Sequence, residues 1–373
     1  MGMPEQAAAS FVGPEETIAA VEPHGWGIIH DTYLVKLSPM AGQFILQRIN
    51  TQVFKNPELI MHNLQVVTEH VQERRKPAGR KILTDWQMVN IIPARDGSNF
   101  FIDPEWEFWR ALRFIRGASP LERITGVNDA FEVGRALGIF HWLLNDLDTG
   151  LLHDTLPGFH NVEQYLEHYD TVLSRGGKAG KSNRICQDFI AGRRSWAPVL
   201  EEARRCKILH LRIMHGDPKI NNIMVDNVTG RAVSIIDLDT VMPGLVQYDI
   251  GDCLRSCCNT VGDEAADFSV VRFDLDLCRA ALTGYMETAG RFLTERDLDF
   301  FFDAVRLIPF ELGLRFYTDF LEDNVYFRVS SSNQNLDRAM VQFKLVQSIE
   351  EQEKEIREII EESRVAVRRS KPR

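Results

Sequence analysis

The sequence predicts an α+β protein with two lobes, a β-rich N-terminal lobe over residues 1–116 and a mainly helical C-terminal lobe over residues 117–373. Three observations support this prediction. A chain of 373 residues is long enough for two domains with substantial cores. The first hundred residues alternate short β-rich segments with Gly- or Pro-containing turns, whereas later apolar residues recur mainly at helical spacing. Between the two patterns, RGASP (116–120) has the composition of a hinge.

Three strands are predicted near the N-terminus, because short β-rich segments are bounded there by turn residues. They are TIAAVEPH (17–24), IHDTYLVKL (29–37) and QFILQRI (43–49). Pro57 is then predicted to open a helix that ends near KPAG (76–79), where Pro and Gly stop the helical pattern.

The rest of the N-terminal lobe is predicted to contain a hairpin. Segments 88–94 and 99–103 flank Asp96-Gly97, a dipeptide that is typical of tight hairpin turns. One more apolar stretch, residues 106–115, precedes the predicted hinge.

The C-terminal lobe is predicted to be built mainly of amphipathic helices, with Asn128 or Asp129 as the cap of the first. The last is predicted to be one long helix, supported by the i,i+4 pairs Glu350–Lys354 and Glu353–Arg357. The helices are expected over residues 129–147, 162–174, 186–203 and 335–369. Period-two patterns over 222–226 and 232–237 predict a short hairpin around NVTG.

Composition limits the classes of function. The sequence is 44% hydrophobic and 26% charged, as in globular proteins, and its net charge of −10 argues against nucleic acid as a partner. Six Cys without a CxxC pair argue against a disulfide or metal framework. No signal peptide or membrane-spanning stretch is visible, and Gln6 breaks a myristoylation pattern. The chain is therefore expected in the cytoplasm, away from membranes; its oligomeric state is not predicted.

The segment HGDPKINN (215–222) has the spacing of a phosphoryl-transfer loop, His-x-Asp-x-x-x-x-Asn. A polar surface turn would use the same residue types. In the catalytic interpretation, Asp217 is the base and Asn222 is an oxygen ligand for Mg²⁺. Mg²⁺ needs a second hard-oxygen ligand, which IIDLDT supplies with Asp237 at the end of a strand. Asp239 is a second choice, either sharing the metal or holding the loop.

These motifs resemble the aminoglycoside phosphotransferase and choline kinase superfamily. Within it, FILQRINTQVFKNPE, IDLDTVMPG, DIGDCLR, LRFYTDFLEDNVYF and FKLVQSIE resemble the bacterial N-acetylhexosamine 1-kinases, over about residues 20–355. The resemblance implies a two-lobed protein-kinase-like fold, ATP in the cleft and a small-molecule sugar on the helical lobe. It also implies the base role for Asp217 and the metal roles for Asn222 and Asp237.

The sequence departs from protein kinases at the strand lysine that holds phosphates, because FILQRIN carries Gln47 and Arg48 there. Arg48 or Lys36 is the predicted substitute. Gly25 and Gly27 of HGWG are predicted to cover the phosphates, although a plain hairpin turn would read the same way.

Lobe order places adenine near the backbone of Arg113–Ile115. The segment RGGKAGKS (175–182) resembles a P-loop but has Arg175 where that motif requires Gly, and it follows a helix. It is interpreted as a basic loop.

The acceptor is predicted to meet Arg255, Arg315 and Tyr326, because guanidinium groups donate fixed hydrogen bonds to hydroxyl and acetamido oxygens. Alternatively, Arg255 pairs with Asp252 and Arg315 with Asp319 for structural reasons. Together with the resemblance, these residues favour an N-acetylhexosamine phosphorylated at its anomeric hydroxyl. A kinase for a choline-, homoserine- or aminoglycoside-type alcohol would keep the same motifs. A pseudokinase would be expected to lose the base or a metal ligand, and none is lost.

Overall fold

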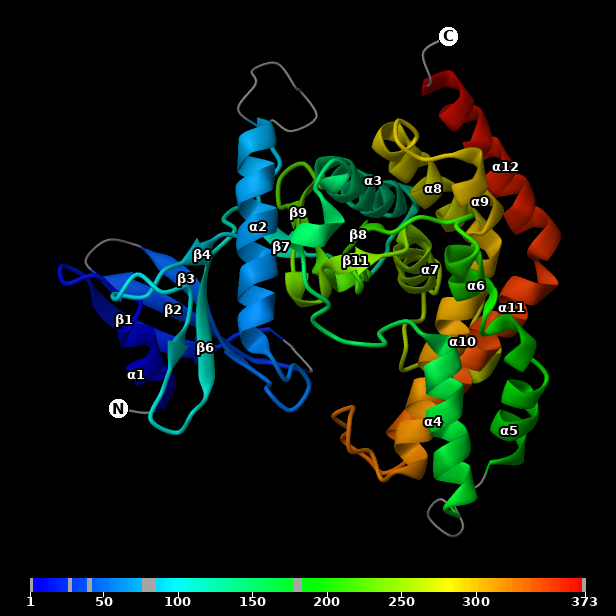
Figure 1. Ribbon diagram of the computed structural model, residues 1–373, viewed down its shortest axis with the longest axis horizontal. Coiled ribbons are helices and arrows are strands. Elements are labelled where there is room, and N and C mark those ends of the chain that lie inside the picture. Colours follow the sequence, from blue (N-terminus) through cyan, green and yellow to red (C-terminus); the bar gives the residue numbers. More distant parts are fainter. Residues whose placement is uncertain (1–2, 26–28, 39–41, 76–84, 177–182, 371–373) are drawn as a thin grey trace.

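The computed structural model describes residues 3–25, 29–38, 42–75, 85–176 and 183–370. A twisted antiparallel sheet forms one end of the molecule and a larger group of helices the other, with helix α2 standing between them (Figure 1). The predicted α+β class, with a β-rich N-terminal part and a helical C-terminal part, is confirmed.

The N-terminal sheet has the strand order β1-β2-β3-β6-β4, with β5 also paired to β6. Its first three strands lie where the β-rich segments predicted them. Their bounds are β1 Thr17–Pro23, β2 Asp31–Ser38 and β3 Gln43–Ile49, followed by β4 Ile91–Ile92, β5 Phe101–Ile102 and β6 Phe108–Arg113. The short helix α1 (Met3–Ala9) packs against β1.

The predicted hairpin at Asp96-Gly97 is only partly formed. Gly97 has φ 86°, and the Ala94 N–H donates to the Ser98 carbonyl at 2.8 Å, so the turn exists. Strands β4 and β5, however, pair with successive parts of β6 and not with each other. Strand β6, buried along nearly its whole length, lies between β3 and these two short strands.

Helix α2 (Pro57–Arg75) begins at Pro57, as predicted. Its predicted stop at residues 76–79 lies outside the described residues. The helix contacts the C-terminal lobe at helix α3 (Val127–Leu144) and at the 3₁₀ turn η5 (Leu238–Thr240).

Ten further helices and two small sheets make up the described part of the C-terminal lobe. The helices after α2 are α3, α4 Val162–Ser174, α5 Arg184–Ala191, α6 Val199–Arg205, α7 Val246–Cys257, α8 Leu275–Ala289, α9 Glu295–Asp299, α10 Phe301–Leu321, α11 Gln334–Glu351 and α12 Glu353–Ser370. The sheets are β7 Ala118–Pro120 with β9 Ile223–Asp226 and β10 Ala232–Ile235, and β8 Arg212–Met214 with β11 Met242–Gly244. Strands β9 and β10 form the predicted antiparallel hairpin.

Three local predictions need correction. Helix α3 is capped by Gly126 without a side-chain bond, and Asp129 instead accepts from Thr125 just before the helix. The segment predicted as one helix over 186–203 is broken into α5 and α6 around Gly192–Pro198.

The long C-terminal helix is also two helices, which meet at Gln352. At this junction the Gln352 side-chain amide donates to the Phe273 carbonyl at 2.9 Å. Glu350 pairs with Arg193 at 2.6 Å, whereas the predicted Glu353–Arg357 pair is present at 2.7 Å.

The predicted hinge combines a turn with a short strand. Gly117 has φ 75°, and Ala118–Pro120 then form β7, which pairs with β9 of the C-terminal lobe. The pairing ties this connection to the hairpin that follows the HGDPKINN loop.

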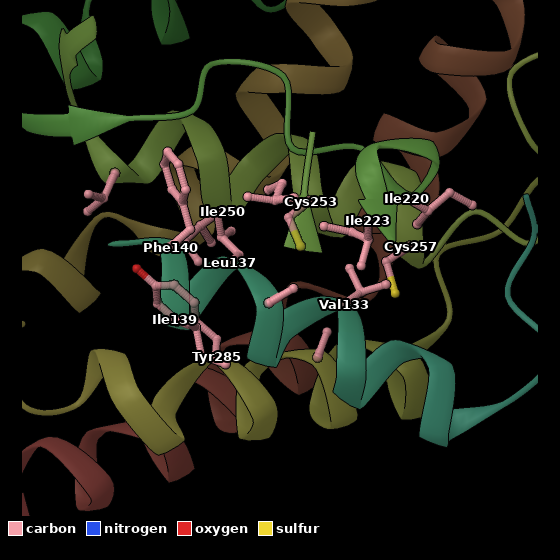
Figure 2. Close-up of a cluster of buried hydrophobic side chains, with 14 of the residues drawn as sticks. Val133, Leu137, Ile139, Phe140, Ile220, Ile223, Ile250, Cys253, Cys257 and Tyr285 are labelled. Carbon is pink, nitrogen blue, oxygen red and sulfur yellow. The ribbon is translucent and has the colours of Figure 1, made fainter. Parts of the chain in front are cut away.

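The core of the C-terminal lobe is built around the packing of α3 on α8. Glycines make the close approach possible, because a Cβ at Gly134 would lie 1.8 Å from the Ala281 carbonyl oxygen. Figure 2 shows that Ile220 and Ile223, which flank the end of the HGDPKINN loop, join the same cluster as Val133 of α3. The loop is therefore anchored in the core. Among the described residues, no helix is both long and apolar enough to cross a membrane.

Candidate active site

The backbone of the HGDPKINN loop is held by a buried carboxylate. Asp249 of α7 accepts hydrogen bonds from the N–H groups of His215 at 2.6 Å and Gly216 at 2.8 Å. Gly216 has φ 88°, and a Cβ there would come within 2.8 Å of Thr240. The turn thus requires glycine, and it directs the next residue, Asp217, out of the core.

Asp249 is itself fixed by a histidine from α3. His141 Nε2 donates to Asp249 at 2.7 Å, and His141 Nδ1 lies 2.9 Å from the Tyr285 hydroxyl. Burial alone would raise the pKa of Asp249, but the hydrogen bond and charge of His141 keep it below the usual range. The carboxylate therefore stays ionised beneath the loop.

Asp217 is hydrogen-bonded to two other residues of the motif, Lys219 and Asn222. Lys219 Nζ donates to Asp217 Oδ2 at 2.6 Å, and the Asn222 amide donates to the Asp217 carbonyl at 2.7 Å and to Oδ2 at 3.2 Å. Burial opposes ionisation, but Lys219 brings the pKa of Asp217 below its ordinary value. The group is an ionised carboxylate with a cation beside it.

Asn222 and Asp237 are brought together by the β9–β10 hairpin. The Ile236 N–H, next to Asp237, donates to the Asn222 carbonyl at 2.9 Å. Because the Asn222 amide nitrogen faces Asp217, its side-chain oxygen is left for another partner.

Asp237 has the left-handed conformation, with φ 65° and ψ 58°, and is exposed. The surrounding lobes remove part of its hydration, and the nearby carboxylates of Asp239 and Asp217 repel its charge, so its pKa is raised. No hydrogen bond or ion pair of its carboxylate is found within the described ranges. A strained carboxylate without a partner is a feature of functional sites.

Asp239, in contrast, has both carboxylate oxygens bonded to residues of the N-terminal lobe. Its oxygens accept from Arg110 of β6 at 2.5 and 2.9 Å, and His30 Nε2 lies 2.6 Å away. Burial would raise its pKa, but Arg110 and His30 hold it well below the usual range. The structure thus shows Asp239 as a bridge between the sheet and the catalytic region; its metal role stays a prediction.

The two cations predicted to hold the phosphates are engaged in ion pairs. Arg48 pairs with Asp31 and, at 3.1 Å, with Glu107, while Lys36 pairs with Glu22 at 2.8 Å. These pairs do not test the predicted phosphate role of Arg48.

Gln47, at the position of the kinase strand lysine, accepts from the Arg110 guanidinium at 2.8 and 3.0 Å. Arg110 in turn holds Asp239. A cation in direct contact with that position is therefore Arg110 of β6, which the sequence analysis did not identify.

The remaining nucleotide predictions concern turns and backbone. Gly25 has φ 72°, as a tight turn requires, whereas Gly27 lies outside the described residues. Arg113, Phe114 and Ile115 line a hollow of about 200 Å³ together with residues 86–88 and 90. The predicted adenine contact at Arg113–Ile115 remains a prediction.

Of the residues predicted to meet the acceptor, Arg255 is buried and bonded to protein. Its Nε donates to Asp252 and its Nη1 to Asp263, both at 2.8 Å. The alternative pairing with Asp252 is thus confirmed, and a sugar contact by Arg255 stays a prediction.

Arg315 does not pair with Asp319, which instead accepts from the backbone of Tyr326 and Phe327. Its guanidinium lies 3.7 Å from Glu311 and is surrounded by four aromatic rings. The ring centroids of Phe159, Tyr165, Tyr326 and Phe327 lie 5.4, 5.0, 5.6 and 5.5 Å from its central carbon. Burial would lower its pKa, but Tyr165, Tyr326, Glu311 and Asp217 raise it. Arg315 is therefore a permanent cation close to Asp217.

Several residues of this site were missed in the sequence, namely His30, Arg110, His141, His160, Lys219 and Glu311. Lys219 lies inside the motif and could have been found there. The others come from distant segments, and nothing local marks them.

The sequence matches the model of the phosphotransferase enzyme family over residues 20–289, more than half of the chain. Three solved structures have a similar protein-kinase-like fold at low sequence identity. The first is a microcompartment-associated aminopropanol kinase, 16% identical, with a TM-score of 0.58 over 95% of this chain and 97% of that one. The second is an aminoglycoside phosphotransferase from Alicyclobacillus acidocaldarius, 12% identical, with a TM-score of 0.58 over 99% of this chain and 97% of that one. The third is a choline kinase from Cryptosporidium parvum, 13% identical, with a TM-score of 0.57 over 89% of each chain.

Proposed function

The chain belongs to the phosphotransferase enzyme family, and from this premise we propose that it transfers the γ-phosphoryl group of ATP to the anomeric hydroxyl of an N-acetylhexosamine. The product is the sugar 1-phosphate. The observation that carries this proposal is Arg315, a cation fixed close to Asp217 where an acceptor has to lie.

Asp217 is the proposed base. An ionised carboxylate at the end of a rigid turn can accept the proton of an acceptor hydroxyl as the phosphoryl group arrives. The anomeric hydroxyl is more acidic than the others on a sugar ring, so a carboxylate with a low pKa suffices. Lys219 beside the base supplies a positive charge at the point where negative charge collects on the transferring group.

The residues at 222 and 237 fit a magnesium ion. Asp237 offers a carboxylate without a partner among the described residues, and Asn222 offers its amide oxygen. No group of three or more His, Cys, Asp or Glu side chains suited to a metal occurs in the described part of the chain. Mg²⁺ matches this small donor set, since it takes most of its ligands from phosphates and water. When bound with ATP, it neutralises phosphate charge.

Arg315 favours a neutral acceptor over a cationic one. Four aromatic rings around a cation are what a quaternary or primary ammonium acceptor would need, but in this chain the guanidinium occupies that place. A second ammonium group beside it would be repelled. Hydroxyl and acetamido oxygens, in contrast, can accept from the guanidinium.

The second candidate is a kinase for another small alcohol or amino alcohol. The fold similarity to an aminopropanol kinase and a choline kinase favours it. The four rings around Arg315 would then serve the acceptor only if the guanidinium moved away.

A substrate panel separates the candidates. The chain is incubated with ATP, Mg²⁺ and, in separate reactions, N-acetylglucosamine, N-acetylgalactosamine, choline, ethanolamine, aminopropanol and an aminoglycoside, and ADP formation is measured. Asp217→Asn serves as the inactive control. ADP release with the two hexosamines supports the proposal. Release only with the amino alcohols would contradict it and would favour the second candidate, a kinase for another small alcohol or amino alcohol.

A further inference from the structure

His160 is buried beneath the catalytic loop, with both ring nitrogens facing atoms that can only accept hydrogen bonds. Its Nε2 lies 2.8 Å from the Gly216 carbonyl oxygen. Its Nδ1 lies 3.1 and 3.2 Å from the two carboxylate oxygens of Glu311. A neutral imidazole carries one N–H and can serve one of these partners, so both bonds require either the imidazolium or a protonated Glu311.

The charges around His160 favour the imidazolium. Burial alone would lower its pKa, but the Glu311 carboxylate raises it, helped by the Gly216 carbonyl and by Asp252. Arg315 lies 3.7 Å from the same carboxylate. Glu311 is only 2% exposed, so two cations compensate one buried anion.

The titratable and charged groups that face His160 come from each element packed against it. They are Glu311 and Arg315 of α10, Tyr248 and Asp252 of α7, and Tyr165 of α4. The Tyr248 ring stacks on the imidazole, with centroids 5.1 Å apart and planes 19° apart. The ring is thus held in one orientation.

His160 contacts the residue that directly precedes the proposed base, Asp217. Asp249 fixes the two N–H groups of residues 215 and 216, and His160 fixes the Gly216 carbonyl, which belongs to the peptide that leads into Asp217. The loop is therefore held from both sides, by an anion on its N–H groups and by a cation on its carbonyl.

We propose that the buried pair of cationic His160 and anionic Glu311 is a positioning device that orients the peptide before Asp217 and connects it to Arg315 at the acceptor side. The inference rests on the roles proposed above for Asp217 and Arg315. Deprotonation of His160 leaves the Gly216 bond on Nε2 but places an Nδ1 lone pair against the carboxylate. Because the pKa is raised in the folded protein, the pair stabilises the loop fully below the ordinary histidine value of 6.5 and stops doing so as the pH rises through the raised value.

The first test is the protonation state itself. Nitrogen NMR of ¹⁵N-histidine-labelled protein at about pH 7.5, where an unperturbed imidazole is mostly neutral, is expected to show both nitrogens of His160 protonated. The signal is assigned by its loss in His160→Gln. In Glu311→Gln the amide can serve a neutral ring, and Nδ1 is expected to lose its proton. This measurement needs no acceptor, so it does not depend on the identity of the alcohol. One protonated nitrogen in the unsubstituted protein would overturn the proposal.

The second test is kinetic. Glu311→Gln is expected to lower kcat about 10-fold to 100-fold, as a small misplacement of the base would, with a smaller change in KM for ATP. In the unsubstituted protein, kcat is expected to decline at alkaline pH as His160 loses its proton. In Glu311→Gln this decline is expected to disappear. The assay uses N-acetylglucosamine, or aminopropanol if only that alcohol is phosphorylated. The matched control is Glu322→Gln, which breaks the surface pair of His168 and Glu322 (2.9 Å).

Thermal unfolding reports whether each variant is folded. The variant His160→Gln/Glu311→Gln is expected to lose no more activity than the more affected single variant, because both act through one contact. An unchanged kcat and pH profile in folded Glu311→Gln, or additive losses in the double variant, would overturn the proposal.

Discussion

At the scale of single residues, Asp217 differs from the other carboxylates of the cleft in what holds it. Asp239 and Asp249 have both oxygens bonded to protein, and Asp237 has no partner in the described part of the chain. Asp217 has Oδ2 held by Lys219 and Asn222, and no hydrogen bond of its other carboxylate oxygen is found in the described part of the chain. This difference in contacts agrees with the roles proposed for Asp217 as the base and Asp237 as a metal ligand.

Replacement of Asp217 by Asn is expected to lower kcat by about 10²- to 10⁴-fold, the usual contribution of a general base. Nucleotide affinity should change little, because Asp217 acts on the acceptor proton. Steady-state kinetics with a saturating acceptor and calorimetric titration with Mg·ATP measure the two quantities. Turnover close to that of the unsubstituted protein would mean that another group is the base.

Replacement of Asp237 by Ala is expected to weaken Mg·ATP binding and to abolish transfer, because it removes the exposed carboxylate of the loop. Replacement of Asp239 should leave the Mg²⁺ dependence of the remaining activity unchanged, because both of its oxygens are bonded to protein. Activity measured across a Mg²⁺ titration distinguishes the two. An equal shift of the Mg²⁺ requirement in both variants would make Asp239 a direct metal ligand as well.

At the scale of elements, the catalytic loop depends on a turn that requires glycine. Gly216→Ala should cost about 1–3 kcal/mol in the free energy of unfolding and should lower kcat, because a Cβ would meet Thr240 at 2.8 Å and shift the loop. Gly230→Ala is the matched control, with a similar φ of 69° in the β9–β10 turn but nothing within 4 Å. Urea unfolding and kcat are measured for both. Full activity in Gly216→Ala would show that the turn does not position Asp217.

The same scale shows what sequence could predict. Strands β1 to β3, helix α4 and the β9–β10 hairpin follow from patterns within ten or so residues, and the structure has them in place. The loop motif and Asp237 could also be found, since spacing and strand context mark them. Arg110 contacts Asp239 across 129 positions and His160 contacts Glu311 across 151, so only the folded chain brings these pairs together. The break of the C-terminal helix at Gln352 was not predicted either, and no local pattern marks it.

At the scale of the whole molecule, the two lobes are joined at the cleft by Asp239, which accepts from Arg110 of β6 and from His30 just before β2. The C-terminal lobe also reaches the sheet through Arg328, 3.9 Å from Asp31. Asn63 of α2 adds a third link, since its amide donates to the Val241 carbonyl at 2.9 Å. The arrangement of the lobes therefore depends on a buried ion pair.

Asp239→Asn is expected to destabilise the protein by about 3–5 kcal/mol at neutral pH, because Arg110 is left without its anion. The carboxyl has a lower pKa folded than unfolded, so its stabilisation is fully present above the ordinary value of 3.8 and is lost progressively as the pH falls toward the much lower folded value. The difference in unfolding free energy between the two proteins should accordingly begin to narrow at about pH 5 and keep narrowing as the pH falls further. Urea unfolding of both proteins at several pH values measures this difference in unfolding free energy. A difference that does not change with pH would contradict a stabilising contribution of the Arg110–Asp239 ion pair.

The central claim, an anomeric kinase, is tested most directly by the chemistry of the product. The protein is incubated with Mg·ATP and N-acetylglucosamine or N-acetylgalactosamine, and the product is analysed for reducing ends and for coupling between phosphorus and the anomeric proton. The account predicts a sugar 1-phosphate, which has lost its reducing end and shows that coupling. A phosphorylated sugar that still reduces would contradict the assignment of the anomeric hydroxyl as the acceptor.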